Sequence, residues 1–185
     1  MMNNNNYNNK LLGHSNLSTP IDLTPAFVTG LADGEGSFGI YLQKTAKNQQ
    51  TGYQVKYEFT IVLHNRDRAL LENVQLFFNG IGGIDKHGKT SSKYRVSSIK
   101  DISIIIDHFA KYPLLTQKRA NYLLFKRAFE LVLRKEHNTP EGFHELLRIK
   151  AAINLGFSDS LKAAFPNTIP VDTPRVEDNA VSDPN

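Results

Sequence analysis

The stretch from Phe27 to Phe38 limits the possible fold more than any other part of the sequence. It has the pattern of a short apolar helix that ends in two acids and three glycines and then runs directly into a strand. Thr24 and Pro25 supply the helix start, as N-cap and first helical residue. This arrangement predicts that Glu35 is held at a fixed point between a helix end and a sheet. A carboxylate held there, beside a basic sheet, suggests metal-assisted cleavage of a nucleic acid backbone.

Composition excludes several classes of protein. The 185 residues are enough for one domain with a sizeable core. The absence of Cys excludes disulfides and thiolate zinc sites. No apolar run approaches the roughly 20 residues that cross a bilayer, and the N-terminus lacks the pattern of a secretory signal. We therefore expect a soluble, intracellular protein with no membrane partner.

Positive charge is concentrated in one part of the chain. Residues 37–100 contain ten Lys or Arg against four Asp or Glu, whereas the rest contains twelve against fourteen. Such a surplus is the expected footprint of a polyanion site, although a solvated basic surface has the same composition.

Three regions differ in composition. Residues 1–20 are rich in Asn, and we expect them to be disordered. Residues 166–185 carry four prolines, several acids and few apolar groups, which is typical of a linker or tail. The single folded domain is predicted to cover residues 21–165.

Hydrophobic periodicity predicts an α+β fold in the order αββαββα, followed by extra helices. The four strands should form an antiparallel sheet with helices gathered on one face. Helices are expected over residues 25–35, 67–79, 99–111, 116–136 and 139–156, with a short one after residue 158. Strands are expected over residues 37–43 and 54–63 and in a hairpin over residues 80–98.

The face without helices should carry mostly polar side chains of mixed donor and acceptor character. Strands can enter the DNA major groove, where such groups can contact base edges. An ordinary solvated sheet face is the alternative. The candidate DNA-binding residues are Ser37, Gly39, Tyr41, Gln43, Thr45, Lys47, Gln54, Lys56, Glu58, Thr60, Lys93, Arg95 and Ser97.

The first helix carries small residues at a spacing of four, namely Ala26, Gly30 and Gly34. Glycine inside a helix costs about 1 kcal/mol relative to alanine, so a compensating contact is expected. Close packing of a second helix is one candidate, and simple unwinding of the helix end is the other. Asp33 and Glu35 at the helix C-terminus oppose the helix dipole, which favours a nearby cation such as Mg²⁺.

Residues 28–36, Val-Thr-Gly-Leu-Ala-Asp-Gly-Glu-Gly, resemble the LAGLIDADG motif of homing endonucleases. The Gly-Leu pair, both acids and the closing Gly are all in place. The resemblance extends to residues 63–67, 112–118 and 163–167, and it covers roughly residues 20–170. The combination most resembles the fungal mitochondrial branch, which has two motifs in one polypeptide.

The resemblance implies two αββαββα units, packed through their motif helices, whose saddle-shaped sheets lie over a long DNA site. It makes Glu35 the metal-binding catalytic acid and the Gly34 carbonyl a further ligand, while Asp33 is structural. The implied cofactor is Mg²⁺, with Mn²⁺ or Ca²⁺ able to replace it in binding. Lys118 corresponds to the basic residue near the active site, and His64 and Arg68 correspond to polar positions around it.

The sequence contains one motif, whereas the branch that it resembles has two. Single-motif members act as homodimers, but the tail after residue 165 favours an N-terminal half or a chain paired with a separate half. We therefore expect double-stranded DNA and a second LAGLIDADG half, a separate chain or an identical copy, as partners. The resemblance also implies a mitochondrial, intron-encoded protein.

The leading hypothesis is a subunit or N-terminal half of a site-specific DNA homing endonuclease that makes a metal-dependent double-strand break. Two alternatives remain open at this point. One is an intron RNA-binding maturase, and the other is a catalytically silent DNA-binding module of the same fold.

Overall fold

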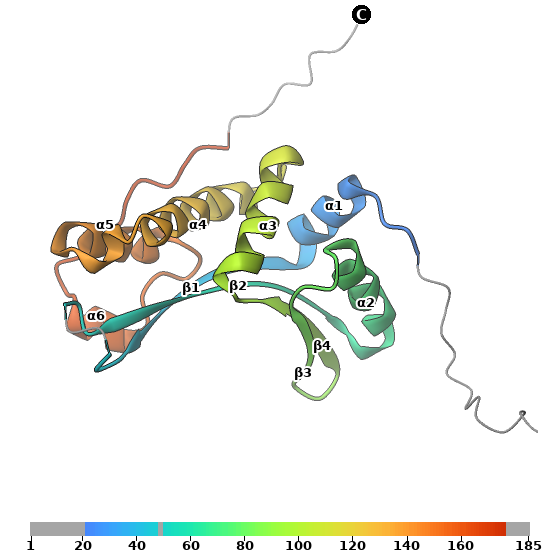
Figure 1. Ribbon diagram of the computed structural model, residues 1–185, viewed down its shortest axis with the longest axis horizontal. Coiled ribbons are helices and arrows are strands. Elements are labelled where there is room, and N and C mark those ends of the chain that lie inside the picture. The colour runs from blue at the N-terminus through green and yellow to red at the C-terminus, as the bar shows by residue number, and fades with distance from the viewer. Residues whose placement is uncertain (1–20, 48–49, 177–185) are drawn as a thin grey trace, which may run out of the picture.

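Four antiparallel strands form one open sheet in the order β1-β2-β4-β3 (Figure 1). The computed structural model describes residues 21–47 and 50–176. The first part runs α1 (Pro25–Glu35), β1 (Gly36–Lys44), β2 (Tyr53–His64), α2 (Arg68–Phe77), β3 (Gly83–His87), β4 (Ser91–Val96) and α3 (Ile99–Lys111). Then follow α4 (Lys118–Leu133), α5 (Pro140–Ala152) and α6 (Asp159–Ala164), with single 3-10 turns at η1 (Asn65–Asp67) and η2 (Glu136–Asn138). The predicted α+β fold and its αββαββα order are confirmed.

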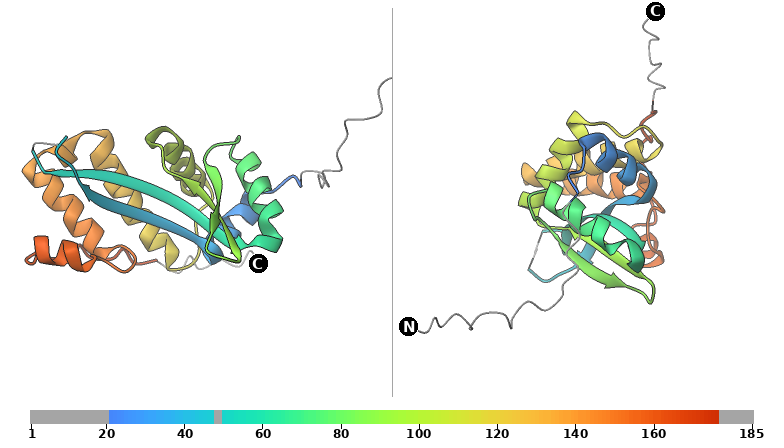
Figure 2. Two further views of the ribbon diagram at one scale, coloured as in Figure 1. Left: turned by 90° about the horizontal axis from the view of Figure 1, so that it is seen from below. Right: turned by 90° about the vertical axis from the view of Figure 1, so that its right-hand side faces the viewer.

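Helices α1 to α5 lie on one side of the curved sheet, and its concave side carries no helix among the described residues (Figures 1 and 2). Helix α6 lies beside the far end of the β1–β2 hairpin, where Phe165 packs on the Tyr53 ring at 5.4 Å between centroids. The predicted segregation of helices to one face is therefore present, and the other face is left open.

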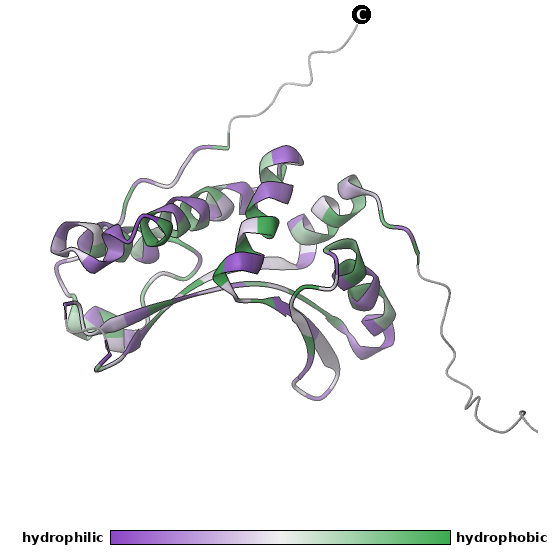
Figure 3. Cartoon of the chain, in the orientation of Figure 1, coloured by the Kyte–Doolittle hydropathy of each residue, from purple (hydrophilic) through white to green (hydrophobic). Residues whose placement is uncertain are grey.

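The strands alternate between buried and exposed side chains, as their sequence period requires. Phe38 and Phe59, both fully buried, lie on the helical face and pack at 5.2 Å between ring centroids. Phe38 also contacts Phe109 of α3 and Phe125 of α4, at 5.5 and 5.4 Å. Hydrophobic and hydrophilic residues alternate along the elements (Figure 3), and the buried apolar side chains of sheet and helices form one core. This aromatic cluster fixes the helical layer on the sheet.

Helix α1 begins as predicted, because the Thr24 hydroxyl accepts a hydrogen bond from the Phe27 amide at 3.2 Å. Its buried face consists of Val28, Thr29 and Ala32. Glu35 is its last residue, and β1 starts at the next position. The helix therefore points its C-terminal end at the beginning of an edge strand.

The expected disordered segment, residues 1–20, lies outside the described residues, as does the end of the expected tail. Residues 166–176 run past α5, where the Val171 amide donates to the Arg148 carbonyl at 3.2 Å and the Val171 side chain is buried. Arg148 in turn donates to the Ile169 carbonyl. Among the described residues, no helix is both long and apolar enough to span a membrane.

A buried polar contact joins α1 to α3. The Thr29 hydroxyl donates to the Tyr112 carbonyl and lies 3.2 Å from Nε2 of His108. Aromatic rings surround the imidazole, with Phe78 and Phe109 at 5.2 and 4.8 Å between centroids. Burial lowers the pKa of His108 to about 4, so this side chain is neutral in the folded protein near neutral pH.

We expect acid to destabilise the protein through His108. As the pH falls from about 7 to about 5.5, His108 becomes protonated in the unfolded chain but stays neutral in the folded chain. This difference lowers the free energy of unfolding by about 1 kcal/mol. The variant His108→Gln keeps a donor for Thr29 but cannot titrate, so urea denaturation should show a flatter pH dependence. His87→Gln, at the exposed end of β3, is the control. Parallel pH profiles for wild type and His108→Gln would contradict this assignment.

Candidate functional site

The C-terminal end of α1 presents two oxygen groups to solvent. Glu35 and Gly34 are both exposed. Within the described part of the chain, the Glu35 carboxylate makes no hydrogen bond or ion pair. Because Gly36 pairs with Ile61 in the sheet, Glu35 lies at the edge where α1, β1 and β2 meet. The predicted placement of this acid between a helix end and a sheet is present.

Asp33 connects this helix end to the loop before α4. Its Oδ2 accepts from the Leu115 amide at 2.7 Å, and its Oδ1 accepts from the Thr116 hydroxyl at 2.8 Å and amide at 3.3 Å. The Thr116 hydroxyl oxygen accepts in turn from the Lys118 amide at 3.2 Å. Asp33 therefore holds the start of α4 against the end of α1, which is a structural role.

Lys118 supplies the cation at this helix end. Its Nζ donates to the Gly34 carbonyl at 3.0 Å, across 84 positions of sequence. An ammonium group is favourable at a helix C-terminus, which carries a partial negative charge. Burial lowers the pKa of Lys118, while the charges of Asp33 and Glu35 oppose that shift. The structure thus brings Gly34, Glu35 and Lys118 together, as the sequence predicts.

These groups fit a divalent ion only in part. Mg²⁺ prefers oxygen ligands and usually keeps several waters, with one or two protein carboxylates. Glu35 offers one carboxylate, and the Gly34 carbonyl offers the lone pair that Lys118 leaves free. Among the described residues, no group of three or more His, Asp or Glu could hold a metal. The donor set suits an ion that takes its remaining ligands from water, DNA or a partner.

His64 ends β2, at the same end of the sheet as Glu35, and Arg68 begins α2. Nδ1 of His64 accepts from the Arg66 amide at 3.2 Å, so the ring serves as a local cap. Arg68 donates to Glu72 at 3.0 Å within α2. Neither side chain is bonded to Glu35 or Lys118 among the described residues. Their role around the active site stays a prediction.

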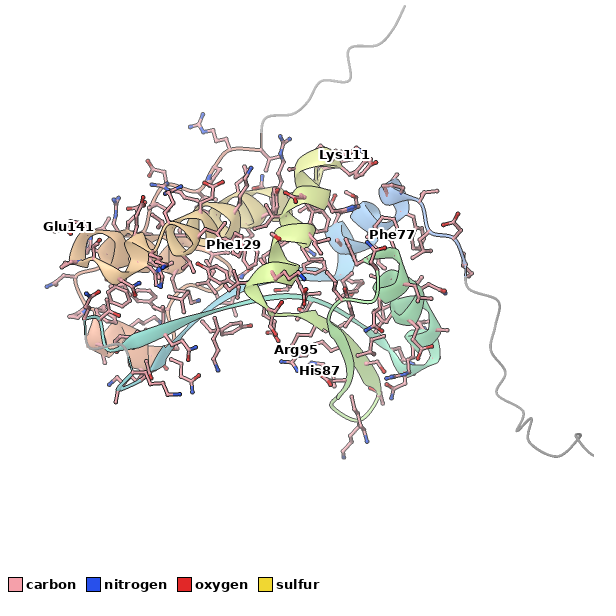
Figure 4. All side chains as sticks on the ribbon, viewed as in Figure 1. Phe77, His87, Arg95, Lys111, Phe129 and Glu141 are labelled. Carbon is pink, nitrogen blue, oxygen red and sulfur yellow. The ribbon has the colours of Figure 1, made fainter. Side chains whose placement is uncertain are left out.

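The candidate DNA-binding residues follow the concave face and its rim, and Figure 4 shows Arg95 pointing to the side without helices. Cross-strand pairs place Ser37 beside Thr60 and Tyr41 beside Lys56. The exposed members are Ser37, Tyr41, Gln43, Lys47, Gln54, Lys56, Arg95 and Ser97. Thr45, Glu58 and Lys93 are half-buried, and Gly39 and Thr60 are buried. The face is therefore open, but two of its predicted members are already covered in the chain alone.

The sequence prediction left out one charged residue of the concave face, Asp85. Asp85 of β3 accepts from Nη2 of Arg95 at 2.8 Å. The register pairs Asp85 with Lys93. Folding residues 80–98 about the predicted turn at His87 would have placed this acid opposite the basic strand, so the signal was present in the hairpin pattern.

The predicted small-residue stripe on α1 is exposed along its whole length. Ala26, Gly30 and Gly34 are all exposed, and a β-carbon added at either glycine would meet nothing within 4 Å in the described ranges outside the helix itself. Phe27 and Leu115, beside this stripe, expose 46% and 74% of their surface. Contacts within the described residues therefore do not explain the two glycines.

The sequence profile of the family described as "LAGLIDADG endonuclease" matches residues 28–129, which include the α1 motif, the whole sheet and most of α4. The chain belongs to this family.

Individual relatives agree with this membership. "Probable intron-encoded endonuclease 2" of Neurospora crassa is 40% identical over 162 residues, which cover 86% of this chain and 36% of that protein. "Uncharacterized 50.9 kDa protein in ND4 intron 1" of Podospora anserina is 44% identical over 140 residues, covering 70% and 31%.

A solved structure matches the fold closely. "Crystal structure of the I-SmaMI LAGLIDADG homing endonuclease bound to cleaved DNA" matches with a TM-score of 0.82 and 39% identity, covering 88% of this chain and 54% of that one. The chain thus spans about a third of the length of these curated relatives and about half of that solved chain.

We expect Asp33→Ala to lower the free energy of unfolding by about 2 kcal/mol, because it leaves the two amides and the hydroxyl of the α4 loop without their charged acceptor. Urea denaturation measures the change. Asp107→Ala, at an exposed position of α3, is the control and should stay within about 0.5 kcal/mol of wild type. Equal losses for both variants would show that the Asp33 contacts do not stabilise the junction.

Proposed function

We propose that the chain is a subunit or the N-terminal half of a site-specific DNA homing endonuclease that makes a metal-dependent double-strand break. The observation that carries this proposal is the exposed carboxylate of Glu35, held where α1 ends and β1 begins, next to the Gly34 carbonyl that Lys118 binds. Family membership and a DNA-bound solved relative support it.

Glu35 and the Gly34 carbonyl would hold a divalent ion, with Mg²⁺ as the natural cofactor and Mn²⁺ or Ca²⁺ able to replace it in binding. When bound, such an ion neutralises phosphate charge and activates water for in-line attack. The chain's own contribution is positional. Asp33 fixes the α4 loop, and Lys118 places one positive charge at the helix end, where a phosphate of the cut strand would lie. His64 and Arg68 are proposed to order solvent at the rim of this site.

A double-strand break needs two such sites, and this chain supplies one. We propose that a second LAGLIDADG half, a separate chain, a covalent continuation or an identical copy, packs on the stripe of Ala26, Gly30 and Gly34. The open space over both glycines supports this, because a second helix could approach closely there. The concave face would then continue across both halves and hold a long DNA duplex.

A mitochondrial location is part of the proposal. Its support is the resemblance to the fungal mitochondrial branch, and the relatives from Neurospora crassa and Podospora anserina whose names place them in introns.

Glu35→Gln should abolish cutting and leave DNA binding nearly unchanged. In a Mg²⁺ cleavage assay with the second half present, on a site selected from a randomised duplex library, we expect a loss of about 10³-fold or more, equivalent to about 4 kcal/mol. Glu141→Gln makes the same chemical change at an exposed position of α5, far from Arg95 on the concave face (Figure 4), and is the matched control.

If the Glu35→Gln variant cuts DNA at the wild-type rate, Glu35 is not the catalytic acid. Salt-sensitive duplex binding by wild type without cutting in Mg²⁺ or Mn²⁺ would favour the silent DNA-binding module. Preference for intron RNA over any duplex, again without cutting, would favour the maturase.

The variant Gly30→Ala should have opposite effects on the stability of the chain and on its pairing with the second half. Because the added β-carbon meets no atom of a described residue outside its own helix, helix propensity should raise the free energy of unfolding of the chain alone by up to about 1 kcal/mol. The same methyl group should weaken pairing with the second half, as measured by molecular mass in solution and by cutting. Gly36→Ala is the contrast, since its β-carbon would lie 2.6 Å from the Ala32 oxygen and should destabilise the chain. Unchanged pairing in Gly30→Ala would remove the stripe as the interface.

A further inference from the structure

One line of polar contacts crosses all four strands on the concave face. Glu58 of β2 lies 3.5 Å from Nε of Arg95 and 3.7 Å from Nζ of Lys93, both on β4. Arg95 donates through Nη2 to Asp85 of β3 at 2.8 Å. On the other side, the Tyr41 hydroxyl of β1 lies over Gly39, the cross-strand partner of Glu58, close enough that the Glu58 charge adds to burial in raising the pKa of Tyr41. We name Tyr41, Glu58, Asp85, Lys93 and Arg95 the cross-sheet network.

Glu58 is the centre of this network and its least exposed member. Its side chain is 18% exposed, against 25% for Lys93 and 43% for Arg95. A carboxylate that has lost much of its water needs cationic or donor partners, and Lys93 and Arg95 supply them here. The sheet that is proposed to bind a polyanion therefore carries an acid in its middle, which opposes simple phosphate attraction.

The Tyr41 ring lies over Gly39, the cross-strand partner of Glu58. A β-carbon at Gly39 would lie 2.7 Å from Cε2 and the hydroxyl oxygen of Tyr41. Only glycine therefore lets the ring lie along its own strand with its hydroxyl toward Glu58. Burial, followed by the charge of Glu58, raises the pKa of Tyr41. The absence of a side chain at Gly39 thus leaves the space on β1 that the Tyr41 ring occupies.

Stability alone does not account for these contacts. Ion pairs between solvent-accessible side chains contribute about 0–1 kcal/mol each. The sheet is already held by the aromatic cluster on its other face, where Phe38 and Phe59 are fully buried. The network instead determines where two cationic side chains lie. Arg95 uses Nε and Nη2 for its two acids, which leaves Nη1 outside both ion pairs.

We propose that Glu58 is a positioning residue for sequence specificity: it holds Lys93 and Arg95 along the sheet, aimed at base edges, and keeps them from binding phosphates indiscriminately. The inference rests on the proposed DNA-binding function of this face. Phosphate contacts supply affinity without sequence information, whereas an oriented guanidinium can donate to guanine O6 and N7. A cation that is already paired loses its partner when it turns to a phosphate, so non-specific binding is disfavoured.

The test compares Glu58→Gln with wild type in the 185-residue chain, on a labelled mixed-sequence duplex, by fluorescence anisotropy over a salt series. Because Lys93 loses its only acid among the described residues and Arg95 loses one of its two, the slope of log Kd against log salt should steepen by about 1 to 2, with binding about tenfold tighter near 0.1 M salt. Glu145→Gln is the matched control, because Glu145 also bridges two cations, Arg127 and Arg148, but lies on α5. Its slope should equal that of wild type.

Asp85→Asn removes one of the two acids of Arg95 and leaves Lys93 paired with Glu58, so it should give a smaller increase. The change Glu58→Gln is then repeated in a Lys93→Gln, Arg95→Gln background. Release of the cations predicts no further steepening there, whereas plain repulsion by the Glu58 charge predicts the same steepening as before. Selection from a randomised duplex library completes the test, since Glu58→Gln should flatten the base preference at positions that the Arg95→Gln variant also loses.

Two failures are distinguishable. If wild type binds no duplex, the proposed function fails. If wild type binds but Glu58→Gln leaves slope and selected sequence unchanged, or if the steepening persists without Lys93 and Arg95, the positioning role of Glu58 is wrong while DNA binding stands. Weaker binding by Glu58→Gln, with loss of one base preference that Arg95→Gln keeps, would make Glu58 a base-reading acceptor and also overturn the proposal.

Discussion

A β-carbon at Gly36 would lie 2.6 Å from the Ala32 carbonyl oxygen, so only glycine lets α1 pass directly into β1. Any larger residue would push the helix end away from the strand and carry Glu35 with it. The close junction explains why the Glu35 carboxylate has a defined position, although it makes no hydrogen bond to any residue that the structure describes. Its geometry comes from the buried face of α1 on one side and the β1–β2 pairing on the other.

The same junction creates an electrostatic problem that the rest of the chain must balance. Two acids at a helix C-terminus are unfavourable, and α1 has no basic residue in its last turn. The compensation comes from far away in sequence: Asp33 binds the loop before α4, and Lys118 binds the Gly34 carbonyl. One acid is neutralised by structural contacts, and the other stays available to a ligand. This division explains why two acids in one motif have different roles.

Local patterns in the sequence predict the elements well and the contacts between them poorly. The helix over residues 99–111 and the turn near His87 follow directly from periodicity and turn residues. The α5 helix ends at Ala152 and not near Gly156: Ile153 is already extended, and Asn154 after it is left-handed (φ 51°) and donates through its side chain to the Phe38 carbonyl at 2.6 Å. No local pattern encodes a partner 116 positions away. The Asp33 contacts and the buried His108 share this cause, whereas the Asp85 ion pair follows from the register of one hairpin.

The basic side chains of this protein fall into two groups, those paired with nearby carboxylates and those without such a partner among the described residues. Lys118 and Arg95 each lie near two carboxylates, so their positions are set before any ligand arrives. Lys56, exposed on β2 beside Tyr41, makes no ion pair within the described part of the chain. A free lysine can follow any nearby phosphate at little cost, whereas a paired one must exchange a partner. The placement of acidic residues on a basic surface therefore determines which basic side chains contribute to DNA affinity and which contribute to sequence discrimination.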